Sequence, residues 1–429
     1  MSAPRPDTSL WHPFSNMAAV RHAELVFTRA EGNWVWGDDG RRFLDATASL
    51  WYANVGHGRR EIIDAITAQA GALDAYSTFG DYSNEPAPAL AERLAGLAPV
   101  DDARVFLGTG GGDGIETAAE LARYYWRTVG QPERTHIVTR DKSYHGTHGF
   151  GTSMAGIEGN RVGFSELIPG GSRVAWDSAA ALEAEIERVG ADKVAAFFCE
   201  PVIGAGGVYP PPRDYLPRVA EVCARHGVLL VVDSVICGFG RMGSWFGVER
   251  WDLRPDMITF AKGVTSGYLP LGGVVVSGRV AEPFWEGDGQ AFRHGATCAG
   301  HPACSAAAPR QPRPPRPRRP GGAGRSPRGA SLRLAGRPPG PPRGERGTWR
   351  CRPPRGRGDL PVGPRGSPRC RRRAAPGRSG RRGACPAPRH RGGSVTAAHD
   401  RGQRADADRR GDRQGSRPRH LSLIDLTAT

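Results

Sequence analysis

The chain has 429 residues, a net charge of +16 and a hydrophobic content of 38%. The positive charge is uneven: residues 1–308 hold 27 basic and 36 acidic side chains, whereas residues 309–429 hold 32 arginines, no lysine and seven acidic side chains. These figures exclude a uniformly basic protein and indicate an ordinary, mildly acidic globular part that ends near residue 308.

The first 58 residues alternate short apolar runs with turns. The segment 24–47 predicts two or three strands around Gly32 and the Asp39-Gly40 pair, a typical hairpin signal. Residues 60–73 and 85–98 then place apolar side chains at helical spacing. No apolar run suits a signal peptide or a membrane span, and no cysteine pair suits a disulfide framework. We therefore expect a soluble cytoplasmic protein with reduced thiols.

Strands and helices alternate from residue 105 onward. Apolar strands are predicted at 105–109, 136–140, 193–200, 228–233, 257–263 and 272–278, and helices at 115–127, 178–189 and 215–227. Nearly continuous apolar strands between amphipathic helices predict an α/β fold with a mostly parallel sheet covered on both faces. Such sheets bind ligands at the carboxyl ends of their strands.

A glycine-rich turn at residues 108–114 joins the first of these strands to a helix. Bare backbone amides at a helix start can bind phosphate, and missing Cβ atoms let it come close. A turn without any ligand is an equally good interpretation of this segment alone. A dinucleotide site is disfavoured, because Asp113 stands where the third glycine should fall.

Two charged residues follow later strands. Asp233 ends a wholly apolar strand, where it either caps the next turn or keeps a heteroaromatic ring nitrogen protonated. Lys262 is one of three lysines before residue 309 and has only small neutral neighbours. A lone lysine is usually a solvated charge, but desolvation would lower the pKa of this amine and make it nucleophilic towards a carbonyl.

Smaller signals occur at two further strand ends. Tyr144 and His145 suit an aromatic platform under a flat ligand, although simple packing explains them as well, and a metal site at His145 and His148 lacks an acidic partner. Glu200 either organises the site or caps a loop. A phosphate cradle, an acid for a ring nitrogen, an aromatic plate and a reactive lysine together fit one cofactor, pyridoxal 5′-phosphate.

Residues 10–308 resemble the class III aminotransferases, the fold-type I group that includes the omega-amino-acid–pyruvate transaminases. Six segments stand in family order: GTGGGDGIETAAELAR, SYHG, EPVIGAGG, VVDSVICGFGR, TFAKGVTSGYLPLGG and HGATCAGHP. The opening SLWHPFSNM also resembles a diaminononanoate-forming enzyme of the biotin pathway. The resemblance implies a pyridoxal-phosphate-binding large domain, transamination, and a homodimer.

The resemblance also assigns roles to single residues. Lys262 would form a Schiff base with the cofactor, and Asp233 would pair with its ring nitrogen. The remaining cofactor-binding residues would be Gly111, Gly112 and Asp113 in the phosphate loop, Tyr144 and Val235 on the two ring faces, His145 and Glu200 beside them, and Thr297 on the partner subunit's phosphate. Trp51 and Tyr52 would line the substrate pocket.

The family pattern stops after residue 308, where a helix start runs into proline-rich sequence. Arg, Pro and Gly make up 72 of the last 121 residues, with Trp349 as the lone aromatic side chain. We therefore expect four parts: 1–58 contributing to a small domain, 59–295 as the large domain, 296–308 as the start of an incomplete α+β small domain, and 309–429 as a disordered basic tail. The composition of this tail is what a GC-rich gene yields when it is read out of frame; a disordered polyanion-binding extension is the alternative.

Three functions follow from these patterns. The first is ping-pong transamination between an amine or omega-amino acid and a 2-oxo acid such as pyruvate, with Lys262 and Asp233 as the catalytic pair. Another fold-type I reaction, racemase or aminomutase chemistry, would use the same cofactor. The third is a catalytically inactive relative with a nonspecific polyanion-binding tail.

Overall fold

The computed structural model describes residues 9–20 and 24–308. Near its start, three short strands form an antiparallel sheet in the order β1 (Phe27–Glu31), β2 (Trp34–Gly37) and β3 (Arg42–Leu44). Gly32 and Gly40 have φ angles of 57° and 78° in the two turns, a conformation that glycine adopts without steric cost. The prediction of two or three strands here is confirmed.

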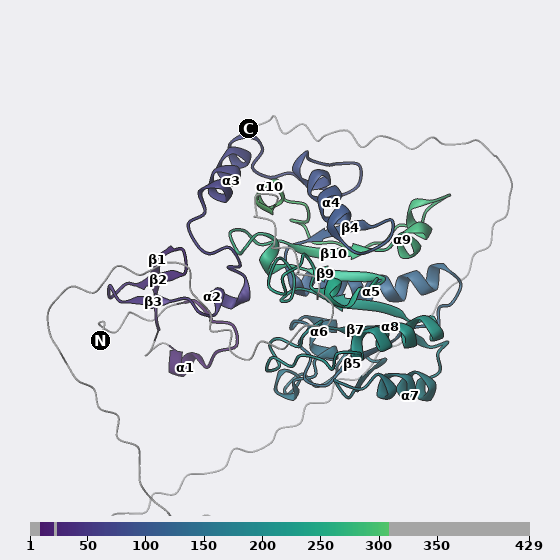
Figure 1. The fold of residues 1–429 in the computed structure, drawn as a ribbon. Coiled ribbons are helices and arrows are strands. Elements are labelled where there is room, and N and C mark those ends of the chain that lie inside the picture. The colour runs from purple at the N-terminus through teal and green to yellow at the C-terminus, as the bar shows by residue number, and fades with distance from the viewer. Residues whose placement is uncertain (1–8, 21–23, 309–429) are drawn as a thin grey trace, which may run out of the picture. The chain divides into compact units, whose positions relative to one another are not determined.

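A second sheet has seven strands (Figure 1). Their order is β4 (Arg104–Gly108), β10 (Gly272–Val276), β9 (Met257–Phe260), β8 (Leu229–Asp233), β7 (Val194–Cys199), β5 (His136–Arg140) and β6 (Gly171–Val174). β10 runs antiparallel to both of its neighbours, and the other pairs are parallel. The prediction of a mostly parallel sheet is therefore confirmed.

Helices cover both faces of this sheet. The helices are α3 (Arg60–Ala72), α4 (Pro86–Leu97), α5 (Gly111–Thr128), α6 (Gly149–Met154), α7 (Ala179–Val189), α8 (Tyr215–His226), α9 (Gly278–Trp285) and α10 (Pro302–Ala307). Alternate strand residues face opposite sides: Phe197 and Val232 share one apolar cluster with α7 and α8, and Phe198 and Val231 share another with α5. Figure 1 shows α7 and α8 side by side.

Several elements differ from the sequence predictions. α5 begins at Gly111 rather than at residue 115, because its first turn is built of glycines that carry no apolar period. β6, α6 and α9 have no clear pattern in the sequence. The short segments α1 (Met17–Val20), α2 (Ala48–Trp51), η1 (Glu158–Asn160), η2 (Val248–Trp251) and η3 (Lys262–Val264) were not predicted either.

No helix within residues 9–20 and 24–308 is both long and apolar enough to cross a membrane. The five cysteines of this part are free, and four of them are buried, as expected for reduced thiols. The predicted tail, residues 309–429, lies outside the described residues. The proposed domain limits at 58 and 295 stay a prediction.

Candidate active site

A cavity of about 130 Å³ opens where β4, β5, β7, β8 and β9 end. Its lining consists of Gly111, Gly112, Ile115, Tyr144, His145, Gly146, Glu200, Asp233, Val235, Ile236 and Lys262. Eight of these residues were predicted from the sequence. They come from segments up to 150 residues apart, and the parallel sheet brings them to one edge.

The glycine turn forms one wall of the cavity. A Cβ atom on Gly111 would lie 3.0 Å from Cγ1 of Val235, and one on Gly112 would lie 2.7 Å from the ring of His148. Neither position has room for a side chain, so the backbone passes close to Val235 and His148 at the start of α5, where the first backbone amides have no partner within the helix. Asp113 behaves differently: its carboxylate accepts hydrogen bonds from the backbone N–H and the hydroxyl of Thr109. Its side chain closes the turn and is outside the cavity lining.

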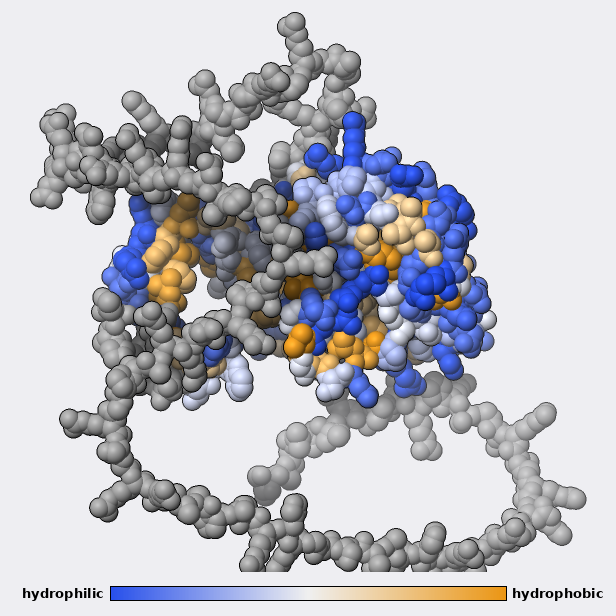
Figure 2. Space-filling view, turned by 90° about the horizontal axis from the view of Figure 1, so that it is seen from below, coloured by the Kyte–Doolittle hydropathy of each residue, from blue (hydrophilic) through white to orange (hydrophobic). Residues whose placement is uncertain are grey.

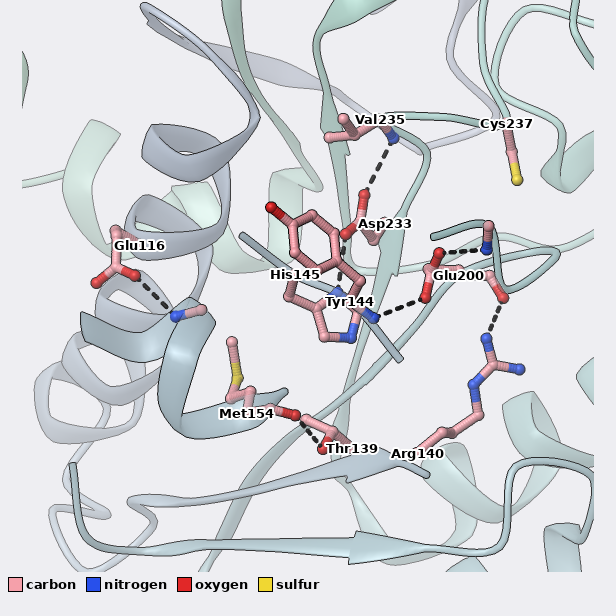
Figure 3. A network of polar contacts seen from close by, with 12 residues as sticks. Glu116, Thr139, Arg140, Tyr144, His145, Met154, Glu200, Asp233, Val235 and Cys237 are labelled. Atoms are coloured by element: carbon pink, nitrogen blue, oxygen red, sulfur yellow. Dashed lines mark hydrogen bonds and ion pairs between the residues drawn. The ribbon is translucent and has the colours of Figure 1, made fainter. Parts of the chain in front are cut away.

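A network of buried polar groups forms the floor (Figure 3). Nδ1 of His145 lies 2.8 Å from Oδ2 of Asp233, and Oδ1 of Asp233 accepts the N–H of Val235. Oε1 of Glu200 accepts the N–H of Tyr144 at 3.2 Å, and Oε2 accepts the N–H of Gly204 at 2.8 Å. The two carboxylates are thus fixed by directed hydrogen bonds, so they form a preorganised acidic surface.

Burial shapes the charge of this floor. Glu200 is 3% exposed, and burial raises the pKa of its carboxyl, with His145 and Arg140 opposing the shift. Nε2 of His145 is buried without a hydrogen-bond partner among the described residues.

Lys262 lies in the short helix η3, directly after β9. Its φ angle is +48°, in the left-handed region that non-glycine residues rarely adopt. Burial lowers the pKa of its amine, while Asp233 and Glu200 act against that shift and Arg241 adds to it. A neutral amine is the nucleophilic form, so the surroundings favour reaction with a carbonyl.

The two predicted substrate residues lie outside this cavity lining. The hydroxyl of Tyr52 pairs with Ser49 Oγ at 2.6 Å, and the carbonyl of Trp51 accepts a hydrogen bond from Arg241. Arg241 also donates to Oδ1 of Asn54 at 2.8 Å. The side chain of Asn54 lies against Gly263, the residue after Lys262, where a Cβ atom would come within 2.4 Å of its amide nitrogen.

The structure therefore links the Trp51 segment to the lysine loop through two side chains, Asn54 and Arg241, that the sequence did not single out. The contact spans 187 residues, and no local pattern announces it. Thr297 is exposed and is not part of the cavity lining. Its expected role concerns a partner subunit and stays a prediction.

These groups set the chemistry that the cavity can support. It offers bare amides for an anion, a tyrosine ring for a flat ligand, a fixed carboxylate for a basic ring nitrogen and a partly buried amine for a carbonyl carbon. No His, Cys, Asp and Glu group of metal-binding geometry lies at this cavity in the described part of the chain. The arrangement thus fits an organic cofactor.

Comparisons with known proteins all point to the same protein family. A profile of class-III aminotransferases matches residues 16–310. A probable aminotransferase of Mycobacterium tuberculosis is 41% identical over 317 residues, covering 70% of this chain and 67% of that protein. A putrescine–pyruvate aminotransferase of Pseudomonas aeruginosa is 38% identical over 301 residues, covering 66% of this chain and 65% of that protein.

Solved structures agree with these matches. An amine transaminase from an uncultivated Pseudomonas species, in its PLP-bound form, has a TM-score of 0.68 and 38% identity, covering 71% of this chain and 74% of that one. The chain thus spans about two thirds of the length of the curated relatives it matches.

Proposed function

The chain belongs to the class-III aminotransferases, enzymes of fold type I that depend on pyridoxal 5′-phosphate, and we propose that it transfers an amino group from an amine or omega-amino acid to a 2-oxo acid such as pyruvate. The observation that carries this proposal is that Lys262, Asp233, Tyr144 and the glycine turn share one cavity. Each residue was proposed for the site on the chemistry of its own side chain or backbone. In the fold, these residues lie at one cavity.

The cavity residues fit the cofactor. Gly111 and Gly112 line the cavity and carry no side chain, so the amides at the start of α5 are accessible to its phosphate. The Tyr144 ring is half-buried in the lining, suited to a flat pyridine, with Val235 available for the other ring face. Asp233 is 5% exposed and already oriented by His145, so it can receive a ring N–H.

Each residue has a distinct task in the proposed reaction. The bound cofactor supplies an electron-withdrawing ring that stabilises negative charge on the substrate carbon. Asp233 would hold a proton on the ring nitrogen through a charge-assisted hydrogen bond. Lys262 would hold the cofactor through Nζ, and its free amine would carry a proton to and from the substrate carbon. The lowered pKa of Lys262 favours the neutral amine that this proton transfer requires.

The relatives and the Trp51 segment support the proposed substrate class. One relative is described as acting with putrescine and pyruvate, and another as an omega-amino acid–pyruvate aminotransferase. Trp51 and Tyr52 are both half-buried and connect to the lysine loop through Asn54. We assign them to the substrate side, with a simple amine or omega-amino acid as donor.

We further propose a homodimer in the cytoplasm. Thr297 is exposed in the segment before α10 and would contact the cofactor phosphate of the partner subunit. A groove of about 850 Å³ lies beside this segment and includes the aromatic side chains Phe79, Phe106 and Phe292. An aromatic groove next to an exposed site residue supports an interface between two copies.

A second candidate is a catalytically inactive, truncated relative with a polyanion-binding tail. It is favoured by one observation: the family match ends at residue 310, whereas residues 309–429 carry 32 arginines and seven acidic side chains. Such a chain would bind the cofactor weakly or not at all, transfer no amine and bind polyanions at low salt. Racemase or aminomutase chemistry would instead convert amino acids without passing nitrogen to pyruvate.

One experiment separates these candidates. The full chain is mixed with pyridoxal 5′-phosphate, reduced with borohydride and analysed by peptide mass spectrometry, and amine transfer is followed as alanine formed from pyruvate. We expect a covalent adduct on Lys262 and alanine formation, both lost in Lys262→Ala and retained in the matched Lys193→Ala. An adduct without alanine favours isomerase chemistry, and little adduct with no alanine favours the inactive relative. Alanine formation at the wild-type rate by Lys262→Ala contradicts the assigned lysine.

A further inference from the structure

A fully buried arginine lies behind the acidic floor of the cavity. Arg140 ends β5 and is 0% exposed, and it ranks first by volume among the fully buried side chains of the described residues. Nη2 donates a hydrogen bond to the carbonyl oxygen of Glu200, as Figure 3 shows. Its guanidinium carbon lies 5.6 Å from the centre of the Tyr215 ring.

The other donors of Arg140 are poorly used. Nε and Nη1 are buried and have no hydrogen-bond partner within residues 9–20 and 24–308. A buried charge with unused donors destabilises a fold unless a nearby opposite charge compensates it. Hydrogen bonding alone therefore does not explain why a charged arginine is buried at position 140.

A second buried arginine gives the contrast. Arg134 is 7% exposed, and its Nε, Nη1 and Nη2 donate to the carbonyl of Val194, the side chain of Gln131 and the carbonyl of Gly227. Its role is to join chain segments away from the cavity. Arg140 makes one such bond, and that bond goes to Glu200.

Arg140 meets Glu200 at its backbone: Nη2 bonds the carbonyl oxygen, and within residues 9–20 and 24–308 no ion pair joins Arg140 to a carboxylate. The titratable or charged groups around Glu200 are Arg140, His145, Asp233, Lys262, Cys199 and Cys237. Burial and Asp233 raise the pKa of Glu200, and the positive charge of Arg140 opposes them. A protonated Glu200 would have one fewer strong acceptor for the N–H groups of Tyr144 and Gly204.

We propose that Arg140 is a positioning residue for the cofactor site: its hydrogen bond to the carbonyl oxygen of Glu200 holds this residue in place, and the Glu200 carboxylate in turn fixes the backbone of Tyr144 and the loop at Gly204. The inference rests on the proposed function, because the Tyr144 ring matters only if a flat cofactor occupies the cavity. Arg140 touches neither substrate nor cofactor, and it acts through one intermediate carboxylate.

The test compares Arg140→Met with Arg134→Met in the full chain. Cofactor affinity is measured by titrating pyridoxal 5′-phosphate from pH 6 to 9. Because the lost hydrogen bond is donated by a charged group, we expect Arg140→Met to weaken binding about ten- to a hundredfold at pH 7. Arg134→Met should lower thermal stability and leave the affinity for the cofactor unchanged.

Arg140→Lys keeps the positive charge, so its affinity for the cofactor should stay within about threefold of the wild type. This variant remains informative if Arg140→Met fails to fold.

A double-variant cycle with Glu200→Gln tests whether Arg140 acts on the cofactor site through the Glu200 carboxylate. Once the carboxylate is removed, Arg140→Met should have little further effect on affinity. Additive losses in the cycle, or equal affinity losses in Arg140→Met and Arg134→Met, would overturn the inference.

A second readout needs no cofactor. Hydrogen exchange of the peptides that contain Tyr144 and Gly204 should accelerate in Arg140→Met and stay unchanged in Arg134→Met. If the wild type binds no pyridoxal 5′-phosphate, the proposed function fails, and this exchange comparison still decides the role of Arg140. Unchanged exchange at both peptides would reject it.

Discussion

The two sheets of the molecule differ in how they bury their side chains. Every residue of β7, β8, β9 and β10 is buried, because helices cover the large sheet on both faces. Every residue of β1 is exposed, and Phe27, Trp34 and Leu44 are 50%, 37% and 57% exposed. Figure 2 shows apolar atoms in orange on the left, the side on which Figure 1 has β1–β3.

This difference in burial indicates which part of the chain can hold an active site without a covering partner. The cavity residues stand on strands whose positions are fixed by two apolar clusters. The small sheet instead presents a groove of about 710 Å³, lined partly by Phe27, Val35 and Phe43. Apolar grooves of this kind usually need a covering partner. The buried polar groups that form the floor of the cavity should therefore stay folded under conditions in which the small sheet has already unfolded.

The largest expected effect comes from opening the core of the large sheet. Phe197→Ala removes a ring that is 0% exposed, and such truncations cost about 3–5 kcal/mol of unfolding free energy. Phe27→Ala removes a half-exposed ring from β1 and should cost less than about 1 kcal/mol. Urea unfolding of both variants measures the difference. Equal losses would mean that the small sheet is packed as firmly as the large one.

A smaller effect is expected where α5 meets β10. A Cβ atom on Gly114 would lie 2.9 Å from the carbonyl oxygen of Gly273, and backbone cannot move aside as a flexible side chain can. Gly114→Ala should therefore destabilise by about 1–3 kcal/mol and loosen the glycine turn that forms the cavity wall.

The matched control for this change is Gly96→Ala in α4. No atom lies within 4 Å of the added methyl group there, so the better helix propensity of alanine should stabilise the chain by about 0.5–1 kcal/mol. Both changes are measured by thermal unfolding. Opposite signs support close helix–strand packing at Gly114, whereas a gain at both positions would show that β10 can shift.

Much of this fold could be predicted because its signals are local. Continuous apolar runs predicted the strands β7 and β8. Ser178 predicted the start of α7, and its side chain does accept the N–H of Ala181 there. The cavity residues follow from the same logic, since each stands directly after a predicted strand. The carboxyl ends of parallel strands meet at one edge.

The parts that could not be predicted depend on long-range contacts. Arg140 stands at the end of a strand, where a charged residue is normally solvated, and only the packing around Glu200 buries it. The bond between Arg241 and Asn54 joins two loops that no periodicity connects. Asp113 turns back to Thr109 instead of lining the cavity, a choice of side-chain direction that spacing does not reveal.

The smallest expected effect is a change in how stability depends on pH. Burial lowers the pKa of Lys262 below its ordinary value of 10.5. Between the folded and the unfolded pKa the unfolded chain binds more protons, so stability rises with pH across that window and the rise is complete near 10.5. Lys262→Met removes the titrating amine, and the slope of unfolding free energy against pH should be shallower than in the wild type between pH 7 and 10. The exposed Lys193 supplies the control, because Lys193→Met should leave that slope unchanged. Parallel slopes for all three proteins, measured without added cofactor, would show that the amine of Lys262 is solvated and that the cavity does not activate it.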